Sequence, residues 1–268
     1  MQESNNRSKK KLWLVICIII AAIVVAAAIF IARYIYISQT EKYEYNALLE
    51  EVVGADYDER QGDAVTLPDG LDYTNHNIDF DKLKEYNNEI IGWIYVPNTQ
   101  VDYPIARHEN DADLDYYLYH DMYQEPAYAG CIYVDYANSG DFTDNNTVLY
   151  GHNMANDTMF GSLHDFEDET FFNENEYFYI YTPDASYKYH IFAAYQTDNT
   201  KLTSAYDFSD EQVYAKYLED IWNIRTMRCN LREDVELSVS DKIVTLSTCV
   251  GSAPDNRYLV QGVLVEDE

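Results

Sequence analysis

One stretch of this chain constrains its folding more than any other. Leu12 to Ala32 is a run of 21 residues without a formal charge, nearly all of them Ile, Val, Ala or Leu. A helix rises about 1.5 Å per residue, so the run spans roughly 30 Å, the thickness of a hydrocarbon core. A core helix of a water-soluble domain is disfavoured because no polar face interrupts the run. The sequence therefore predicts a transmembrane helix over residues 12–32.

A cleaved signal peptide is the alternative interpretation of this run. The apolar region of a signal peptide is usually about 7–15 residues long. This run is longer, and no strongly polar stretch follows it until Gln39. We therefore expect a signal anchor that is retained.

Basic residues lie mainly on the amino-terminal side of the apolar run. Only Arg33 and Lys42 lie close after it, whereas four basic residues precede it: Arg7, Lys9, Lys10 and Lys11. The positive-inside rule predicts a cytoplasmic tail over residues 1–11 and places the rest of the chain outside the cell.

The overall charge excludes one class of function. The chain has 18 Lys plus Arg against 47 Asp plus Glu, a net charge of −29. Nucleic-acid binding depends on clustered Lys and Arg facing phosphates, so we expect no nucleic-acid partner. Hydrophobic residues make up 47% of the chain, which is ample for a packed core.

Residues 33–78 predict a juxtamembrane helix followed by an acidic linker. The helix is expected over residues 36–53, ended by Gly54. Residues 55–78 are rich in Asp, Gly and Pro, which is typical of a linker. We expect one folded domain over residues 79–268, beginning with a short helix at 80–90.

From Trp93 onward the sequence changes to short segments rich in Ile, Val, Tyr and Phe, bounded by turn residues. Such spacing predicts a mainly β domain, a sandwich or a barrel. Expected strands cover Trp93–Val96, Cys131–Val134, Thr147–Gly151, Tyr177–Tyr181, Tyr187–Tyr195, Ile243–Thr248 and Tyr258–Val265. One long helix is expected late in the domain, over Asp210–Met227, with Ser209 as its N-cap.

The four cysteines have different surroundings. Cys17 lies in the apolar run, and Cys131 sits among apolar strand residues, which predicts a buried small side chain. Cys229 has no supporting motif, and a Cys131–Cys229 disulfide is the less favoured alternative. Cys249 ends an apolar strand, where a thiol is held by the sheet yet reachable from solvent, as a nucleophile requires.

Two further residues suit chemistry at Cys249. Arg257 follows it across a short loop, where a guanidinium favours a thiolate or stabilises an oxyanion. His152 follows the expected strand at Thr147–Gly151, so that a Cys/His pair for acyl transfer is a candidate.

The remaining histidines have no chemical companion in the sequence. Surface or hydrogen-bonded roles are expected for all of them: His76, His108, His120, His164 and His190. No spacing matches a structural zinc site, so we expect neither a metal nor a cofactor.

Several segments together carry a family resemblance. The segments Tyr150-Gly-His-Asn-Met and Thr245-Leu-Ser-Thr-Cys, with Arg257, resemble the catalytic motifs of the class B sortases, cysteine transpeptidases of the Gram-positive cell surface. Ile91-Gly-Trp-Ile-Tyr-Val-Pro-Asn-Thr, Val101-Asp-Tyr-Pro-Ile and Met159-Phe-Gly-Ser-Leu are similar to class B stretches in the same order. The resemblance covers roughly residues 75 to 265. Val250 departs from it, because many class B members have an acidic residue there.

The resemblance implies a fold and a reaction. The implied fold is a closed β-barrel with a helical segment before it and a long helix between two late strands. The implied catalytic residues are Cys249, His152 and Arg257, acting on a C-terminal sorting signal of the Asn-Pro-x-Thr type. The implied partners are exported proteins that carry this signal and an amine of a cell-wall peptide or of its lipid-linked precursor.

Two alternatives to a transpeptidase stay open at this stage. A membrane-tethered cysteine peptidase would use the same Cys249 and His152 and transfer the acyl group to water. A surface domain without catalysis would bind ligands through its many tyrosines.

Overall fold

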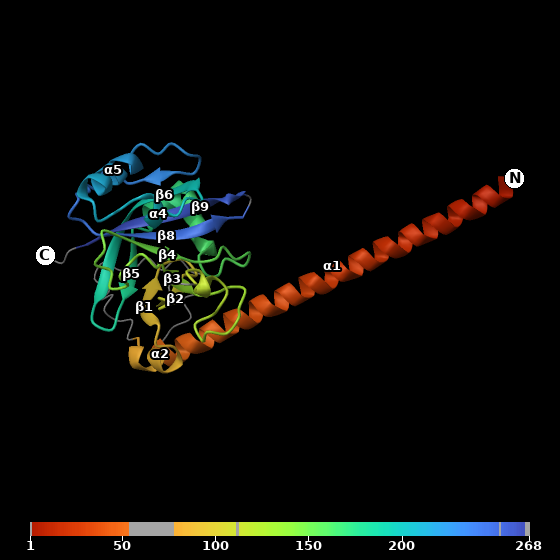
Figure 1. Cartoon of the computed structure of the whole chain (residues 1–268), viewed down its shortest axis with the longest axis horizontal. Helices are drawn as coiled ribbons and strands as arrows, with labels where there is room; N and C mark the ends of the chain where they lie inside the picture. The colour runs from red at the N-terminus through yellow and green to blue at the C-terminus, as the bar shows by residue number, and fades with distance from the viewer. Residues whose placement is uncertain (1, 54–77, 111–112, 252, 266–268) are drawn as a thin grey trace. The chain divides into compact units, whose positions relative to one another are not determined.

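The computed structural model describes residues 2–53, 78–110, 113–251 and 253–265, which form two compact units, Met1–Asn46 and Ala47–Glu268. Figure 1 shows the course of the chain. The predicted acidic linker at 55–78 lies almost wholly outside the described residues.

Helix α1 (Gln2–Val53) contains the apolar run. Within the described part of the chain, one segment is long and apolar enough to cross a membrane, Trp13–Tyr36, with a mean hydropathy of 3.5. Its large side chains are exposed, 69% at Trp13 and 74% at Phe30, unlike those of a core helix. The helix continues to Val53, where the expected juxtamembrane helix also ends.

The last turns of α1 belong to the second unit and pack on the short helix α2 (Phe80–Tyr86). Leu48 and Val52 are buried, and Lys82 forms an ion pair with Glu51 at 2.8 Å. The backbone N–H of Asp79 donates to the carbonyl of Val52. Helix α2 ends four residues earlier than expected because strand β1 begins at Ile90.

Eight strands in the described residues close into a barrel, as the resemblance implied. Their order is β5-β1-β2-β3-β4-β8-β9-β6, and pairing of β5 with β6 closes the ring. The two-residue β7 pairs with β6 outside the ring. The strands are β1 (Ile90–Tyr95), β2 (Asp102–Ala106), β3 (Ile132–Val134), β4 (Asn146–Tyr150), β5 (Tyr177–Tyr181), β6 (Ser186–Asp198), β7 (Asn230–Leu231), β8 (Ile243–Val250) and β9 (Ala253–Leu264).

All seven expected strands are confirmed, and two strands were missed. Strand β2 carries Asp102 and Pro104, which disfavour strands. Asp102 is nonetheless buried, and its carboxylate accepts a hydrogen bond from the Trp93 indole at 2.6 Å. Strand β7 is too short for any periodicity to show.

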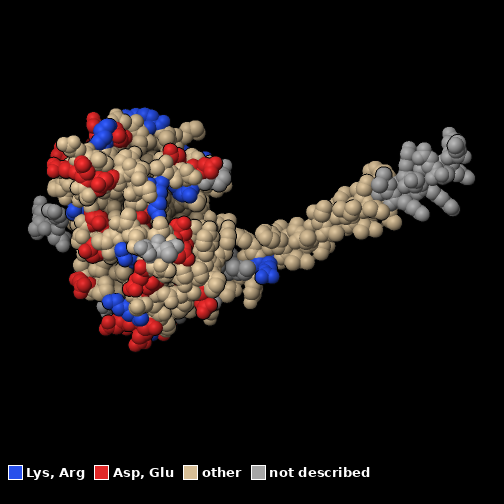
Figure 2. All heavy atoms as spheres, in the orientation of Figure 1, with Lys and Arg blue, Asp and Glu red and all other residues tan. Residues whose placement is uncertain are grey.

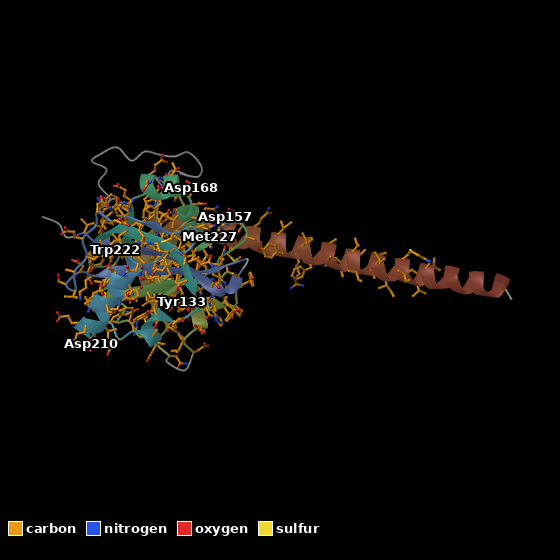
Figure 3. All side chains as sticks on the ribbon, turned by 90° about the horizontal axis from the view of Figure 1, so that it is seen from above. Tyr133, Asp157, Asp168, Asp210, Trp222 and Met227 are labelled. Atoms are coloured by element: carbon orange, nitrogen blue, oxygen red, sulfur yellow. The ribbon has the colours of Figure 1, made fainter. Side chains whose placement is uncertain are left out.

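Helix α5 (Glu211–Ile221) covers one side of the barrel and is shorter than expected. It buries Tyr214, Tyr217 and Leu218 in a cluster that includes Phe192 of β6 and Leu259 of β9. The expected N-cap at Ser209 is wrong. Asp210 caps the helix instead, because its carboxylate accepts from the backbone N–H groups of Gln212 and Val213; Figure 3 labels Asp210 and, after the last helical turn, Trp222.

Smaller helical turns connect the strands without joining the barrel wall. They are η2 (Tyr116–Leu118), η3 (Gly161–Glu167), α3 (Glu169–Glu174) and α4 (Leu202–Ala205). Figure 2 shows Asp and Glu interspersed with Lys and Arg over the visible face of the barrel. The acidic excess is thus distributed over this face and forms no continuous patch on it.

Candidate active site

The end of strand β8 carries the predicted nucleophile. Cys249 is half-buried and its thiol is free, as are the thiols of Cys17, Cys131 and Cys229, so the alternative Cys131–Cys229 disulfide is absent. Strand β8 lies between β4 and β9 in the barrel wall (Figure 1). Its ladder to β9 includes Cys249, whereas its ladder to β4 ends two residues earlier, at Ser247.

Strand register brings the three predicted site residues to the same end of adjacent strands. Strand β8 pairs with β4 in parallel, and Tyr150 lies opposite Ser247. His152 and Cys249 each follow two residues after that pair. Strand β9 runs antiparallel to β8 and places Arg257 directly opposite Cys249. Thiol, imidazole and guanidinium therefore belong to three neighbouring segments at one rim of the barrel.

Hydrogen bonds continue the junction of β4 and β8 up to His152. The Gly151 N–H donates to the Ser247 carbonyl at 3.2 Å, and the Thr248 hydroxyl donates to the Gly151 carbonyl at 2.9 Å. Gly151 is buried, and a Cβ here would lie 2.7 Å from the ring of Phe160 and 2.5 Å from the end of Ile132. A side chain at this position would force Phe160 or the backbone to move, so the close packing between the strand and His152 favours glycine.

The imidazole of His152 is oriented by a backbone carbonyl. Its Nε2 lies 2.8 Å from the carbonyl oxygen of Leu118. A carbonyl only accepts, so Nε2 carries a proton, and Nδ1 is the unprotonated nitrogen of the neutral ring. Burial lowers the pKa of His152, and the Leu118 hydrogen bond opposes this in part.

Two exposed tyrosines flank this imidazole. The ring of Tyr128 stacks on His152 with centroids 5.8 Å apart, and Tyr119 is tilted against it at 6.3 Å. Their exposed fractions are 63% and 59%. They form an open aromatic wall beside the candidate site.

Arg257 is half-buried on β9, and its guanidinium donates to the Asn256 carbonyl at 3.1 Å. Strand β9 begins at Ala253, five residues before the expected start at Tyr258. The hairpin from β8 is therefore tight, with Val250 opposite Ala253. Val250, the departure from the family pattern, is 6% exposed and packs as an apolar residue.

Sequence reasoning missed a group of residues around the Cys249 carbonyl. That oxygen accepts from the side-chain amide of Asn153 at 2.8 Å and lies 3.0 Å from Nε2 of His164. Nothing in the spacing of His164, 85 residues before Cys249, indicates this contact. The described residues contain no group of three or more His, Cys, Asp or Glu arranged to hold a metal ion.

Comparison with known proteins identifies the class. The sortase domain family model matches residues 94–265. A curated relative, sortase B of Listeria monocytogenes, is 34% identical over 185 residues, which cover 68% of this chain and 72% of the relative. Sortase B of Staphylococcus aureus is 30% identical over 170 residues, covering 63% and 67% of the two chains.

Solved structures agree with the sequence relatives. The crystal structure of Clostridium perfringens sortase B superposes with a TM-score of 0.63 at 33% identity, covering 70% of this chain and all of that one. A Staphylococcus aureus sortase B–substrate complex has a TM-score of 0.61 at 29% identity, covering 70% and 85%. The chain belongs to the sortase family, and within it to class B. It is accordingly a sortase-type cysteine transpeptidase, an enzyme that anchors surface proteins.

Proposed function

We propose that this enzyme is anchored in the membrane by α1, cleaves an Asn-Pro-x-Thr-like sorting signal and joins the released protein to a cell-wall peptide amine. The observation that carries the proposal is the register that places Cys249 opposite Arg257 and level with His152. Three groups with complementary roles in acyl transfer thereby share one rim of the barrel.

The Cys249 thiolate attacks the carbonyl carbon of the signal threonine and forms a tetrahedral oxyanion. Arg257 stabilises that negative charge. The oxyanion collapses to a thioester as the C–N bond breaks, and His152 donates its proton to the departing amine. An incoming amine then attacks the thioester, His152 takes its proton, and Cys249 leaves as thiolate.

The hydrogen bond to the Leu118 carbonyl supports an assignment of which His152 nitrogen transfers the proton in this cycle. It holds the proton on Nε2 of His152 in both the neutral and the charged ring. Nδ1 is then the nitrogen that gains and loses the catalytic proton. Burial lowers the pKa of His152 and so disfavours the charged ring.

The choice of partners rests on the family and on the sequence. One relative is described in complex with its substrate, which supports a peptide signal as ligand. The Asn-Pro-x-Thr pattern follows from the resemblance to class B. Basic residues before the apolar run favour a cytoplasmic amino terminus and a catalytic domain outside the membrane, next to exported proteins and lipid-linked wall precursors.

Covalent capture of a sorting peptide tests the proposal directly. The full chain in detergent is incubated with an Asn-Pro-x-Thr peptide, and the acyl-enzyme is measured by mass spectrometry. We expect a thioester on Cys249 that is absent in Cys249→Ala and present in the matched control Cys229→Ala. Acyl transfer by Cys249→Ala would refute the nucleophile assignment.

Product analysis separates transfer from hydrolysis. With a wall-peptide amine added, we expect the peptide–amine conjugate to replace the free acid. Free acid alone, at any amine concentration, would show a peptidase. Selective binding of peptide without acylation would show a binding domain.

A further inference from the structure

The Cys249 carbonyl is held by side chains at a position where the β-ladder has ended. In β8, alternate carbonyls face β4, and the Ser247 carbonyl accepts the Gly151 N–H. The Cys249 carbonyl is the next to face this way, but β4 stops at Tyr150. The side-chain amide of Asn153 donates to it at 2.8 Å, in place of a backbone N–H.

His164 makes the second contact to this oxygen. Its Nε2–H donates to the Cys249 carbonyl oxygen at 3.0 Å, beside the Asn153 amide nitrogen 3.0 Å away, which donates to the same oxygen. Its Nδ1–H donates to a carboxylate oxygen of Glu167 at 2.7 Å; because carbonyl and carboxylate both only accept, this arrangement takes the charged ring with a proton on each nitrogen. The ring also stacks on Tyr258 of β9, with centroids 5.0 Å apart. A ring held on two edges and one face has little freedom to rotate.

The chain of contacts extends to the loop after α5. Glu167 forms an ion pair with Arg228, whose backbone has a positive φ of 61°. Helix η3, this loop and strand β9 are thereby joined around His164. The contacts connect three parts of the fold to the peptide that follows the thiol.

We propose that Asn153 and His164 are positioning residues for the nucleophile, a proposal that rests on the assignment of Cys249 above. A peptide unit is planar, so contacts to its oxygen fix the orientation of the whole Cys249–Val250 peptide. They thereby fix the Cα that carries the thiol. Neither side chain exchanges a proton or touches the substrate in this role.

The proposal predicts a loss in the acylation rate and not in peptide affinity. His164→Phe keeps the ring on Tyr258 and removes both nitrogens. We expect the acylation rate at saturating peptide to fall about tenfold while KM stays within about twofold, because misplaced reacting groups slow the chemical step. His164→Gln, whose amide reaches the same oxygen, should recover most of the rate.

A spectroscopic measurement tests the contact without any substrate. Cys249–Val250 is the one Cys-Val pair in the chain. Labelling Cys with ¹³C at the carbonyl and Val with ¹⁵N therefore gives a single carbonyl–amide correlation in NMR. We expect His164→Phe to shift this peak and His164→Gln to move it back toward the wild-type position. Asn153→Ala is a second variant that should also shift it.

His190→Phe is the matched control, because His190 is half-buried on β6 and stacks on Tyr177 at 4.9 Å. It should change neither the peak nor the rate. An unshifted peak in His164→Phe, or an unchanged acylation rate, would overturn the positioning role. If His164→Phe shifts the peak but the wild-type chain forms no acyl-enzyme, the proposed function is refuted while the contact to the Cys249 carbonyl is established.

Discussion

Gly151, between strand β4 and His152, offers the sharpest test of how packing supports the site. In Gly151→Ala the added methyl would lie 2.7 and 2.8 Å from two ring carbons of Phe160 and 2.5 Å from Cδ1 of Ile132. The end of the Ile132 side chain can rotate away. The Phe160 ring is fully buried and cannot. The clash must therefore be relieved by movement of the ring or of the backbone at residues 150–152.

Overpacking of this kind costs about 1–3 kcal/mol. A domain of this size loses roughly 2–4 °C of Tm per kcal/mol, so we expect a fall of about 2–12 °C. Backbone movement would also displace His152, and a 1 Å misplacement costs up to about 100-fold in rate. We therefore expect kcat/KM to fall about 10- to 100-fold.

The assay combines thermal unfolding with peptide transpeptidation. Gly251→Ala is the matched control, because a Cβ at this exposed residue meets, among the described residues, the Asn153 amide nitrogen alone, at 3.8 Å. Its stability should change by less than about 0.5 kcal/mol. Wild-type Tm together with wild-type kcat/KM in Gly151→Ala would refute the steric argument.

Two further predictions concern stability. Asp210→Ala removes both cap hydrogen bonds of α5 and should lower the free energy of unfolding by about 1 kcal/mol in denaturant titrations. Ser209→Ala should lower it by less than half of that. Equal losses in the two variants would contradict the assignment of Asp210 as the N-cap. Burial lowers the pKa of His152 below its usual 6.5, so the unfolded chain binds more protons between the two pKa values. The free energy of unfolding should therefore fall as the pH drops below about 6.5. His152→Gln should make the free energy of unfolding less dependent on pH between pH 7.5 and 5.5. If its pH dependence were the same as in the wild type, His152 would not be the group responsible.

The sequence predicted the strands well because side-chain composition determines them locally. Segments such as Ile243–Thr248 are rich in β-branched residues and bounded by turns, so they could be located without a structure. Strand β2 could not, because the features that make it a strand are tertiary: Asp102 is tolerated only through the indole of Trp93. The end of α5 at Ile221 was missed for a similar reason, since apolar residues continue at helical spacing to Ile224.

The reactive residues of the candidate site could be predicted from the sequence, but the residues that hold them in position could not. Cys249, His152 and Arg257 stood out as reactive residue types at strand ends within family-like motifs. His164 gave no such signal, because its partner is a backbone carbonyl and any residue type supplies one. Asn153 lies inside the quoted motif beside His152, yet its contact to Cys249 depends on the parallel pairing of β4 and β8.

That parallel pairing also bears on how the enzyme folds. Asn153 and the carbonyl it holds are 96 residues apart, and β8 and β9 follow every other barrel strand along the chain. Contacts of such high sequence separation form late and slowly, since loop closure must come first. During synthesis His152 is added to the chain about 100 residues before Cys249 and Arg257. The three site residues therefore come together only after β8 and β9, the last strands along the chain, have paired with each other and with β4.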